Sequence, residues 1–258
     1  MNANGEITQL FDPNLTLAVF VLFCRIGGCL MLMPGWSTAQ IPVQIRLFIA
    51  VATTLALTPI LIDQAPLRSL SADPLPALRL IAVESAIGMT IGVLGRFLFL
   101  ALEAMAVGAA AMLGLANPFG VEVEPGAALP PLATFVVLAA TALIFFSDAH
   151  WEALRGIVAS YRAIPMGADF DSGYSLRQAA KGLADSFRVA LRITSPFILY
   201  AIAVNLAMAL INRLTPQIAI FYVATPFIVA GGLLLLFFTA RPMLGEFMAA
   251  FVAWLTTG

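Results

Sequence analysis

The residues best suited to chemistry in this sequence are its single histidine, His150, and the two acidic residues beside it. Asp148 and Glu152 flank His150 in the run Ser147-Asp-Ala-His-Trp-Glu152. Residues that alternate by two spread around a helix axis instead of converging, and a catalytic zinc ion usually takes three protein ligands. We therefore expect a helix end with capping polar groups and no metal site. The sequence also contains no nucleophile elbow, phosphate loop, HExxH motif or dinucleotide fingerprint, so we expect neither an enzyme nor a bound cofactor.

A second group of candidates consists of ionisable residues inside otherwise apolar segments. Charges in such positions are costly in a bilayer and are commonly functional. Arg96 and Glu103 are seven residues apart, which places them on one helix face but about 10 Å apart along the axis, too far to pair directly. Two interpretations stay open: a coupled transport path, or ion pairs that hold an assembly together. The group comprises Arg25, Arg46, Glu84, Arg96 and Glu103.

The composition defines the class of protein that must position these residues. Of the 258 residues, 61% are hydrophobic and 10% are charged, whereas a soluble domain has about 45–50% and about 25%. The formal net charge of −1 supplies no basic field for nucleic acid. Cys24 and Cys29 lie five residues apart in the first apolar run, where we expect them to act as small buried hydrophobic residues. The chain is therefore predicted to be an integral membrane protein.

About six long hydrophobic helices are expected, several of them kinked or broken, in an all-α polytopic fold. A segment of 38 residues, 78–115, would reach about 57 Å as one helix, nearly twice the ~30 Å hydrocarbon core. It must be tilted, broken, bent or extended beyond the bilayer, and Gly88-x-x-x-Gly92 within it suits close helix contact. Residues 1–14 contain no Lys or Arg, so the first apolar run is expected to stay as a membrane helix. The candidate segments are 14–33, 41–62, 78–115, 127–147, 193–212 and 217–240.

A basic amphipathic helix is predicted in the polar region 148–192. The run Ser175-Leu-Arg-Gln178 has the form of a capping box that opens a helix. The positive-inside rule places this region in the cytoplasm, and the helix suits either anionic lipid headgroups or a docking partner. Its basic face consists of Arg177, Lys181, Arg188 and Arg192, beside an apolar stripe of Leu176, Ala180, Leu183, Phe187 and Leu191.

The C-terminal part contains an internal echo. Thr194-Ser-Pro196-Phe-Ile198 recurs as Ala224-Thr-Pro226-Phe-Ile228, with the two prolines 30 residues apart. Each proline falls inside an apolar helix, where it removes a hydrogen bond and bends the axis. Because Asn212-Arg-Leu-Thr-Pro216 forms a short polar turn between them, we expect a hairpin of two kinked helices.

Short motifs in a characteristic order connect the chain to a known family. Near the N-terminus these are Arg25-Ile-Gly-Gly28, Pro34, Ile41-Pro42, Arg46-Leu-Phe-Ile-Ala50 and Pro59, which closes the second helix in the family. In the middle they are Ser147-Asp-Ala-His-Trp151, Ser160-Tyr161 and Ile164-Pro-Met-Gly167. Near the end they are Ala190-Leu-Arg192, Pro196, Asn205-Leu206, Asn212-Arg213 and Pro216-Gln217. Together they resemble the FliR family of flagellar biosynthetic proteins and its type III secretion counterparts, over most of the chain.

The resemblance implies a non-enzymatic subunit of the flagellar export gate in the bacterial inner membrane, at the flagellar basal body. Members of the family assemble with FliP and FliQ, and beyond them with FlhB and FlhA, around a pore for unfolded flagellar proteins. The likeness divides the chain into a FliP-like portion, 1–186, and a FliQ-like hairpin and tail, 187–258. Two alternatives stay open: an injectisome export-gate subunit, and a stand-alone secondary transporter that uses the intramembrane charges.

The resemblance also implies a loop that obstructs the pore after the third apolar stretch. The chain departs from the family here, with Ala116-Asn117-Pro118 where the family tends to have Phe-Asp-Pro, and Glu103-Ala-Met-Ala in place of a Gln-rich stretch. An ordinary loop between helices is the alternative. The residues at the matching positions are Leu113, Gly114, Leu115, Asn117, Pro118, Phe119 and Gly120.

Overall fold

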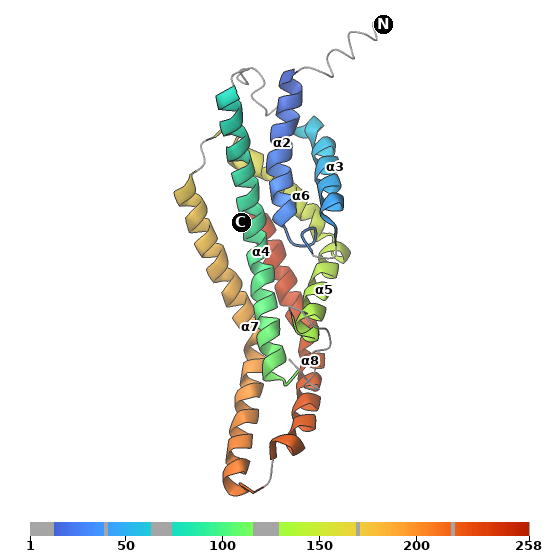
Figure 1. The fold of residues 1–258 in the computed structure, drawn as a ribbon, viewed down its shortest axis with the longest axis vertical. Coiled ribbons are helices and arrows are strands. Elements are labelled where there is room, and N and C mark those ends of the chain that lie inside the picture. The colour runs from blue at the N-terminus through green and yellow to red at the C-terminus, as the bar shows by residue number, and fades with distance from the viewer. Residues whose placement is uncertain are drawn as a thin grey trace. The chain divides into compact units, whose positions relative to one another are not determined.

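In the computed structural model the chain is α-helical, and the part that the structure describes comprises residues 13–38, 41–62, 74–115, 129–168, 171–217 and 220–257. Across these ranges there are seven helices and no strand, which confirms the all-α class (Figure 1). The helices are α2 (Pro13–Leu32), α3 (Val43–Leu61), α4 (Pro74–Met112), α5 (Pro131–Phe146), α6 (Ala149–Ala163), α7 (Ser172–Leu214) and α8 (Ile220–Thr257).

Helix length and apolarity confirm the expected polytopic membrane class. Five helices in the described ranges are long and apolar enough to cross a membrane, and α5 with α6 adds a sixth if that pair forms one broken span. Pro59, expected to close the second helix, instead lies inside α3, two residues before its end at Leu61.

The overlong segment 78–115 forms one uninterrupted helix, α4, of 39 residues. Its glycines serve contact with α2, as the Gly88-x-x-x-Gly92 spacing predicts. A methyl group on Gly88 would overlap the carbonyl oxygen of Arg25, and one on Gly92 would lie 2.6 Å from the carbonyl oxygen of Cys29. The absent side chains therefore let the two backbones approach closely.

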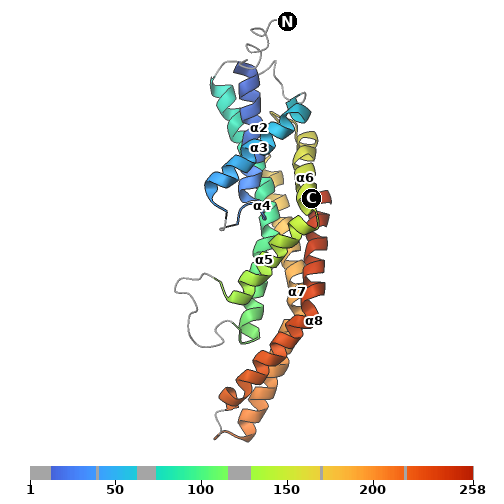
Figure 2. The ribbon, with the colours of Figure 1, turned by 90° about the vertical axis from the view of Figure 1, so that its right-hand side faces the viewer.

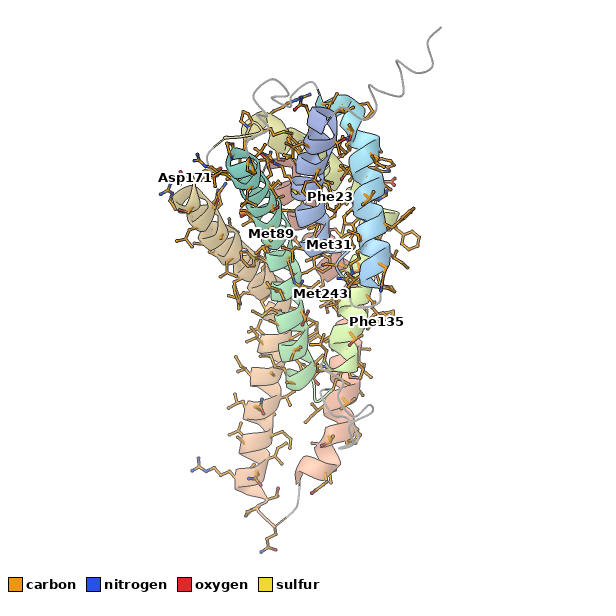
Figure 3. All side chains as sticks on the ribbon, turned by 45° about the horizontal axis from the view of Figure 1, so that its top comes forward. Phe23, Met31, Met89, Phe135, Asp171 and Met243 are labelled. Carbon is orange, nitrogen blue, oxygen red and sulfur yellow. The ribbon has the colours of Figure 1, made fainter. Side chains whose placement is uncertain are left out.

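Helix α7 joins the polar region to the next apolar segment in one run of 43 residues. The expected basic amphipathic helix thus continues into a membrane-length helix, as predicted. The predicted capping box at Ser175 is wrong, because the helix begins three residues earlier, at Ser172. The carboxylate of Asp171, labelled in Figure 3, accepts the backbone N–H of Tyr174 at 2.9 Å and caps the first turn instead.

The chain forms two compact units. Unit 1 contains α2, α3, α6, the part of α4 up to Arg96 and the start of α7 up to Gly182. Helix α2 lies beside α3 and α4 in both views (Figures 1 and 2). The core of unit 1 includes fully or nearly fully buried side chains from α2 and α6, namely Leu22, Ile26, Ile157 and Tyr161.

Unit 2 contains α5, the C-terminal part of α4 and most of α7 and α8. Phe99 on α4 meets Phe247 and Phe251 on α8 edge to face, with ring centroids 5.0 and 5.9 Å apart. Helices α7 and α8 form the expected hairpin, in which the Tyr200 hydroxyl donates to the carbonyl of Ile228 at 2.6 Å. Pro196 and Pro226 both lie inside continuous helices, and a bend at each stays a prediction.

Candidate functional site

The most developed polar site in the described chain is an ion pair buried between α2 and α4 of unit 1. The Arg25 Nε donates to Glu84 Oε2 at 2.6 Å, and both side chains are completely buried. The two residues are 59 positions apart in the chain, so only the packing of α2 against α4 joins them. Both residues belong to the intramembrane charges expected from the sequence, and the structure brings this pair together.

The same guanidinium also caps the C-terminus of α6. Arg25 Nη1 donates to the carbonyl oxygens of Ser160 at 3.2 Å and Ile164 at 2.9 Å. The last carbonyls of a helix lack partners within the helix, and a cation there is favoured by the helix dipole. Arg25 therefore joins three helices: α2, which carries it, α4 through Glu84, and α6 through its terminal carbonyls.

Tyr161 and Gly167 complete this arrangement. We call it the Arg25 cluster, and its members are Arg25, Glu84, Ser160, Tyr161, Ile164 and Gly167. The Tyr161 ring lies 4.2 Å from the guanidinium carbon, and its hydroxyl donates to the carbonyl of Leu22 at 3.3 Å. The backbone N–H of Gly167 donates to the second Glu84 oxygen at 3.2 Å. Gly167 has φ +84°, a conformation that favours glycine at this turn after α6.

The chemistry of the Arg25 cluster is that of a structural clasp. Both oxygens of the Glu84 carboxylate accept hydrogen bonds, one from Arg25 and one from Gly167, and the side chain is out of contact with solvent. Within the described residues, Arg25 Nη2 is the one nitrogen of this guanidinium without a hydrogen-bond acceptor. Breaking such a pair leaves an uncompensated buried charge, so the cluster fixes the mutual positions of α2, α4 and α6.

The structure does not bring the other nominated charges into this cluster. Half-buried Arg46 donates to the carbonyls of Thr38 at 2.6 Å and Ile41 at 2.9 Å, and so fastens the turn that precedes α3. Arg96 is exposed on α4, and Glu103 is half-buried further along the same helix. Neither has a hydrogen bond or ion pair within the described chain.

The first residues of the predicted plug lie where α4 ends, in unit 2. The N–H of Leu115 bonds to the carbonyl of Ala110, and that of Gly114 to Ala111, while Gly114 has φ +71°. This is a Schellman motif, in which a left-handed glycine satisfies the last helix carbonyls. Leu113 is fully buried and would contact any side chain added at Gly232 of α8. Asn117, Pro118, Phe119 and Gly120 lie outside the described residues.

The basic face of α7 is solvent-accessible in all four of its members, Arg177, Lys181, Arg188 and Arg192. Arg188 pairs with Asp185 at 2.6 Å, and Arg192 approaches Glu246 at 3.4 Å; all four of these side chains are about half exposed or more. The apolar stripe beside this face is exposed as well, with Leu176 at 72% and Leu191 at 51%.

The His150 cluster is not a helix cap of the expected kind. Asp148 occupies the N-cap position of α6 with φ +58°, but its side chain makes no capping hydrogen bond. The left-handed backbone at Asp148 marks the sharp turn between α5 and α6. No three His, Cys, Asp or Glu side chains come together as metal ligands in the ranges that the structure covers.

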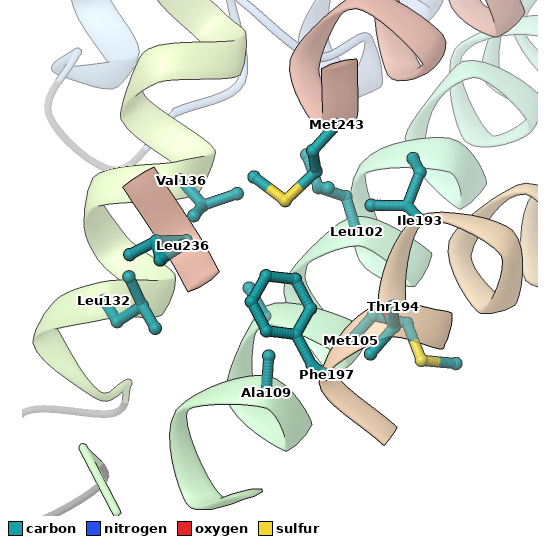
Figure 4. A pocket seen from close by; sticks show the side chains of 11 residues that line it. Leu102, Met105, Ala109, Leu132, Val136, Ile193, Thr194, Phe197, Leu236 and Met243 are labelled. Carbon is teal, nitrogen blue, oxygen red and sulfur yellow. The ribbon is translucent and has the colours of Figure 1, made fainter. Parts of the chain in front are cut away.

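Unit 2 contains a small apolar cavity of about 20 Å³ that no sequence pattern predicts (Figure 4). Phe197 points into it from α7 and Met243 from α8, and the other walls come from α4 and α5. This volume is about that of one water molecule, and the lining is apolar, so it cannot hold a substrate. Tyr161 and Gly167 also belong to the site, and although both fall in sequence motifs of the family, no local signal shows that they meet Arg25.

The long apolar helices of this chain, two of which (α2 and α4) are joined by a buried ion pair, define a polytopic helical membrane protein. The sequence matches the profile of bacterial export proteins, family 1, over residues 16–253. The chain belongs to this family.

Individual relatives agree with this assignment over most of their length. The chain is 28% identical over 243 residues to the flagellar biosynthetic protein FliR of Caulobacter vibrioides, a match that covers 92% of this chain and 91% of that protein. It is 29% identical over 232 residues to FliR of Aquifex aeolicus, covering 88% and 87%. It is 25% identical over 219 residues to FliR of Escherichia coli, covering 82% and 80%.

Proposed function

We propose that this protein is a non-enzymatic subunit of the flagellar type III export gate in the bacterial inner membrane. The observation that carries the proposal is the match to relatives named flagellar biosynthetic protein FliR across four-fifths or more of both chains. The export-family membership over residues 16–253 supports the same role.

In this proposal the chain assembles with FliP and FliQ, and beyond them with FlhB and FlhA, around a pore for unfolded flagellar proteins. Every helix of membrane length carries exposed apolar residues, and these supply surface for partner helices. The outer face of α3 carries Phe48 at 73% exposure, and α8 carries Phe227 at 75% and Phe237 at 76%. We propose the division into a FliP-like portion, 1–186, and a FliQ-like portion, 187–258, on the resemblance alone.

The remaining site assignments follow from the same proposal. The segment from Leu113 to Gly120 acts as the pore plug, anchored where the Schellman motif ends α4. Pro196 and Pro226 shape the hairpin. The basic face of α7 meets anionic headgroups or a partner. Arg46 and the other intramembrane charges support assembly, directly or through the fold of the chain itself.

The geometry gives less support to a stand-alone transporter. Such a protein would use Glu84, Arg96 and Glu103 for coupling, yet Glu84 is sealed against Arg25 while Arg96 is exposed 12 residues along the same helix. Twelve residues separate two side chains by about 18 Å along the helix axis. An injectisome gate subunit is the nearer alternative, because it needs the same fold.

An in-frame deletion in the source bacterium tests the proposal, scored for filaments by electron microscopy and for flagellin in the medium. We expect the deletion strain to lack both, and the intact gene to restore both.

Pull-down of the tagged chain in mild detergent should recover FliP-like and FliQ-like proteins. Normal flagella in the deletion strain would remove the flagellar role and leave the injectisome subunit or transporter; a stable monomer that takes up substrate alone in liposomes would support the transporter.

A further inference from the structure

Arg96 is an exposed cation in the interior of a long apolar helix. It lies 22 residues after the start of α4 at Pro74 and 16 residues before its end at Met112. It has no hydrogen bond or ion pair with any residue that the structure describes. A charge in such a position normally faces another protein group, because its exposure to lipid is costly.

Arg96 continues an exposed stripe of unit 1. Leu75, Ala82, Met89 and Arg96 recur at intervals of seven residues, and all four are exposed (Met89 is labelled in Figure 3). A seven-residue interval returns to nearly the same side of a helix and is the period at which helices pack along a common seam. Gly88 and Gly92, which contact α2, occupy an adjoining side of α4, so the stripe itself is left open.

We infer that this stripe receives an apolar helix of another subunit that places a carboxylate against Arg96. Arg25 provides the precedent within the same unit, because its partner is a carboxylate on the neighbouring helix at 2.6 Å. A carboxylate also suits the planar, permanently charged guanidinium better than a single carbonyl does. Helix runs of about 24 Å or more extend on both sides of Arg96, which favours a neighbouring helix over a lipid phosphate at the membrane surface.

The inference rests on the proposed assembly and is tested on the assembled complex. Tagged wild-type chain, Arg96→Lys, Arg96→Gln and Arg96→Glu are expressed with the other membrane subunits, and the recovered complex is quantified in mild detergent. We expect Arg96→Glu to lower the yield by about tenfold or more, because it sets two like charges against each other. Arg96→Lys, which keeps the charge, should retain more complex than Arg96→Gln.

A matched control separates this effect from misfolding. Arg155→Glu changes an exposed arginine of α6 in the same unit, and it should leave the yield within about twofold of wild type. The purified Arg96→Glu chain should unfold at the same SDS concentration as the wild-type chain. A selection for restored assembly of Arg96→Glu should then return Asp or Glu changed to Lys or Arg in a co-purifying membrane subunit.

The outcomes distinguish the inference from the proposed function. Failure of the wild-type chain to recover any partner would remove the proposed function itself. Full recovery with Arg96→Glu would overturn only the inference. Restoration by a changed acidic residue of this same chain would place the partner within the chain and overturn it too. A dependence on anionic lipid would also overturn the inference. In that case the yield of wild-type complex would fall when anionic lipid is withdrawn while the yield with Arg96→Gln would not change, because a lipid phosphate would be the partner.

Discussion

Neutralising one member of the Arg25–Glu84 pair should destabilise the protein far more than neutralising both. Arg25→Met removes three donated hydrogen bonds and leaves Glu84 buried with only the N–H of Gly167. Glu84→Leu leaves the guanidinium with two backbone carbonyls and no counter-charge. Loss of one partner from a fully buried ion pair costs about 3–5 kcal/mol.

The double variant should cost less than either single variant. With both charges absent, the main unsatisfied groups are the carbonyl of Ile164 and the N–H of Gly167, since the Ser160 carbonyl still accepts the N–H of Ile164. An unsatisfied backbone group costs about 1–3 kcal/mol when it is fully buried, and each of these two groups costs less, because Ile164 is half-buried and Gly167 is exposed. We therefore expect a loss of about 1–3 kcal/mol and a coupling energy of about 3 kcal/mol or more between the two sites.

SDS titration of the purified chain in mild detergent, followed by tryptophan fluorescence and by limited proteolysis, measures these differences. The matched control is Arg155→Met, which breaks an exposed pair with Glu152 on α6 of the same unit and should change stability by about 0–1 kcal/mol. The reasoning would be refuted by single variants that differ little from the control. Additive losses in the double variant would equally show that the two charges do not act as a pair.

Three further predictions concern glycines and the plug. Gly88→Ala should lower stability by about 1–3 kcal/mol in the same titration, because its methyl overlaps the Arg25 carbonyl; Gly108→Ala, with open space on the same helix, is the control and should cost nothing. Gly114→Ala should cost about 1–2 kcal/mol, since an L side chain is disfavoured at φ +71°; a cost no larger than that of Gly108→Ala would argue against the Schellman end of α4. Shortening the segment 114–126 should raise ion leak through the assembled complex in planar bilayers, and unchanged conductance would remove the plug assignment.

The sequence alone was enough for the class of protein and for the residues worth testing. Sixty-one per cent hydrophobic residues and apolar runs of membrane length require helices, because a bilayer demands that backbone groups pair within their own segment. Helix period placed the basic residues of α7 on one face, and small-residue spacing identified Gly88 and Gly92 as a contact surface. Arg25 and Glu84 stood out because ionisable residues are rare in such segments.

Local signals failed where two local rules competed or where the decision lay between helices. The sequence favours a capping box at Ser175, but Asp171 supplies a carboxylate four residues earlier and the helix begins at Ser172. Pro59 lies inside α3, two residues before the helix ends at Leu61, although its missing N–H removes one hydrogen bond to the preceding turn. Asp148 has the residue type of a cap but turns the chain with its backbone instead.

Only the tertiary structure decided which charges meet. Sequence period gives the side of a helix on which a charge lies, but the identity of the facing helix depends on packing across the whole unit. Arg25 bonds to Glu84, which is 59 positions away in the chain, and to the end of α6, which is more than 130 positions away. Arg46 instead bonds to carbonyls of the turn just before α3, and Arg96 stays exposed. Residues of one chemical type thus differ in role because burial makes an unpaired charge costly, and the fold alone fixes which of them are buried.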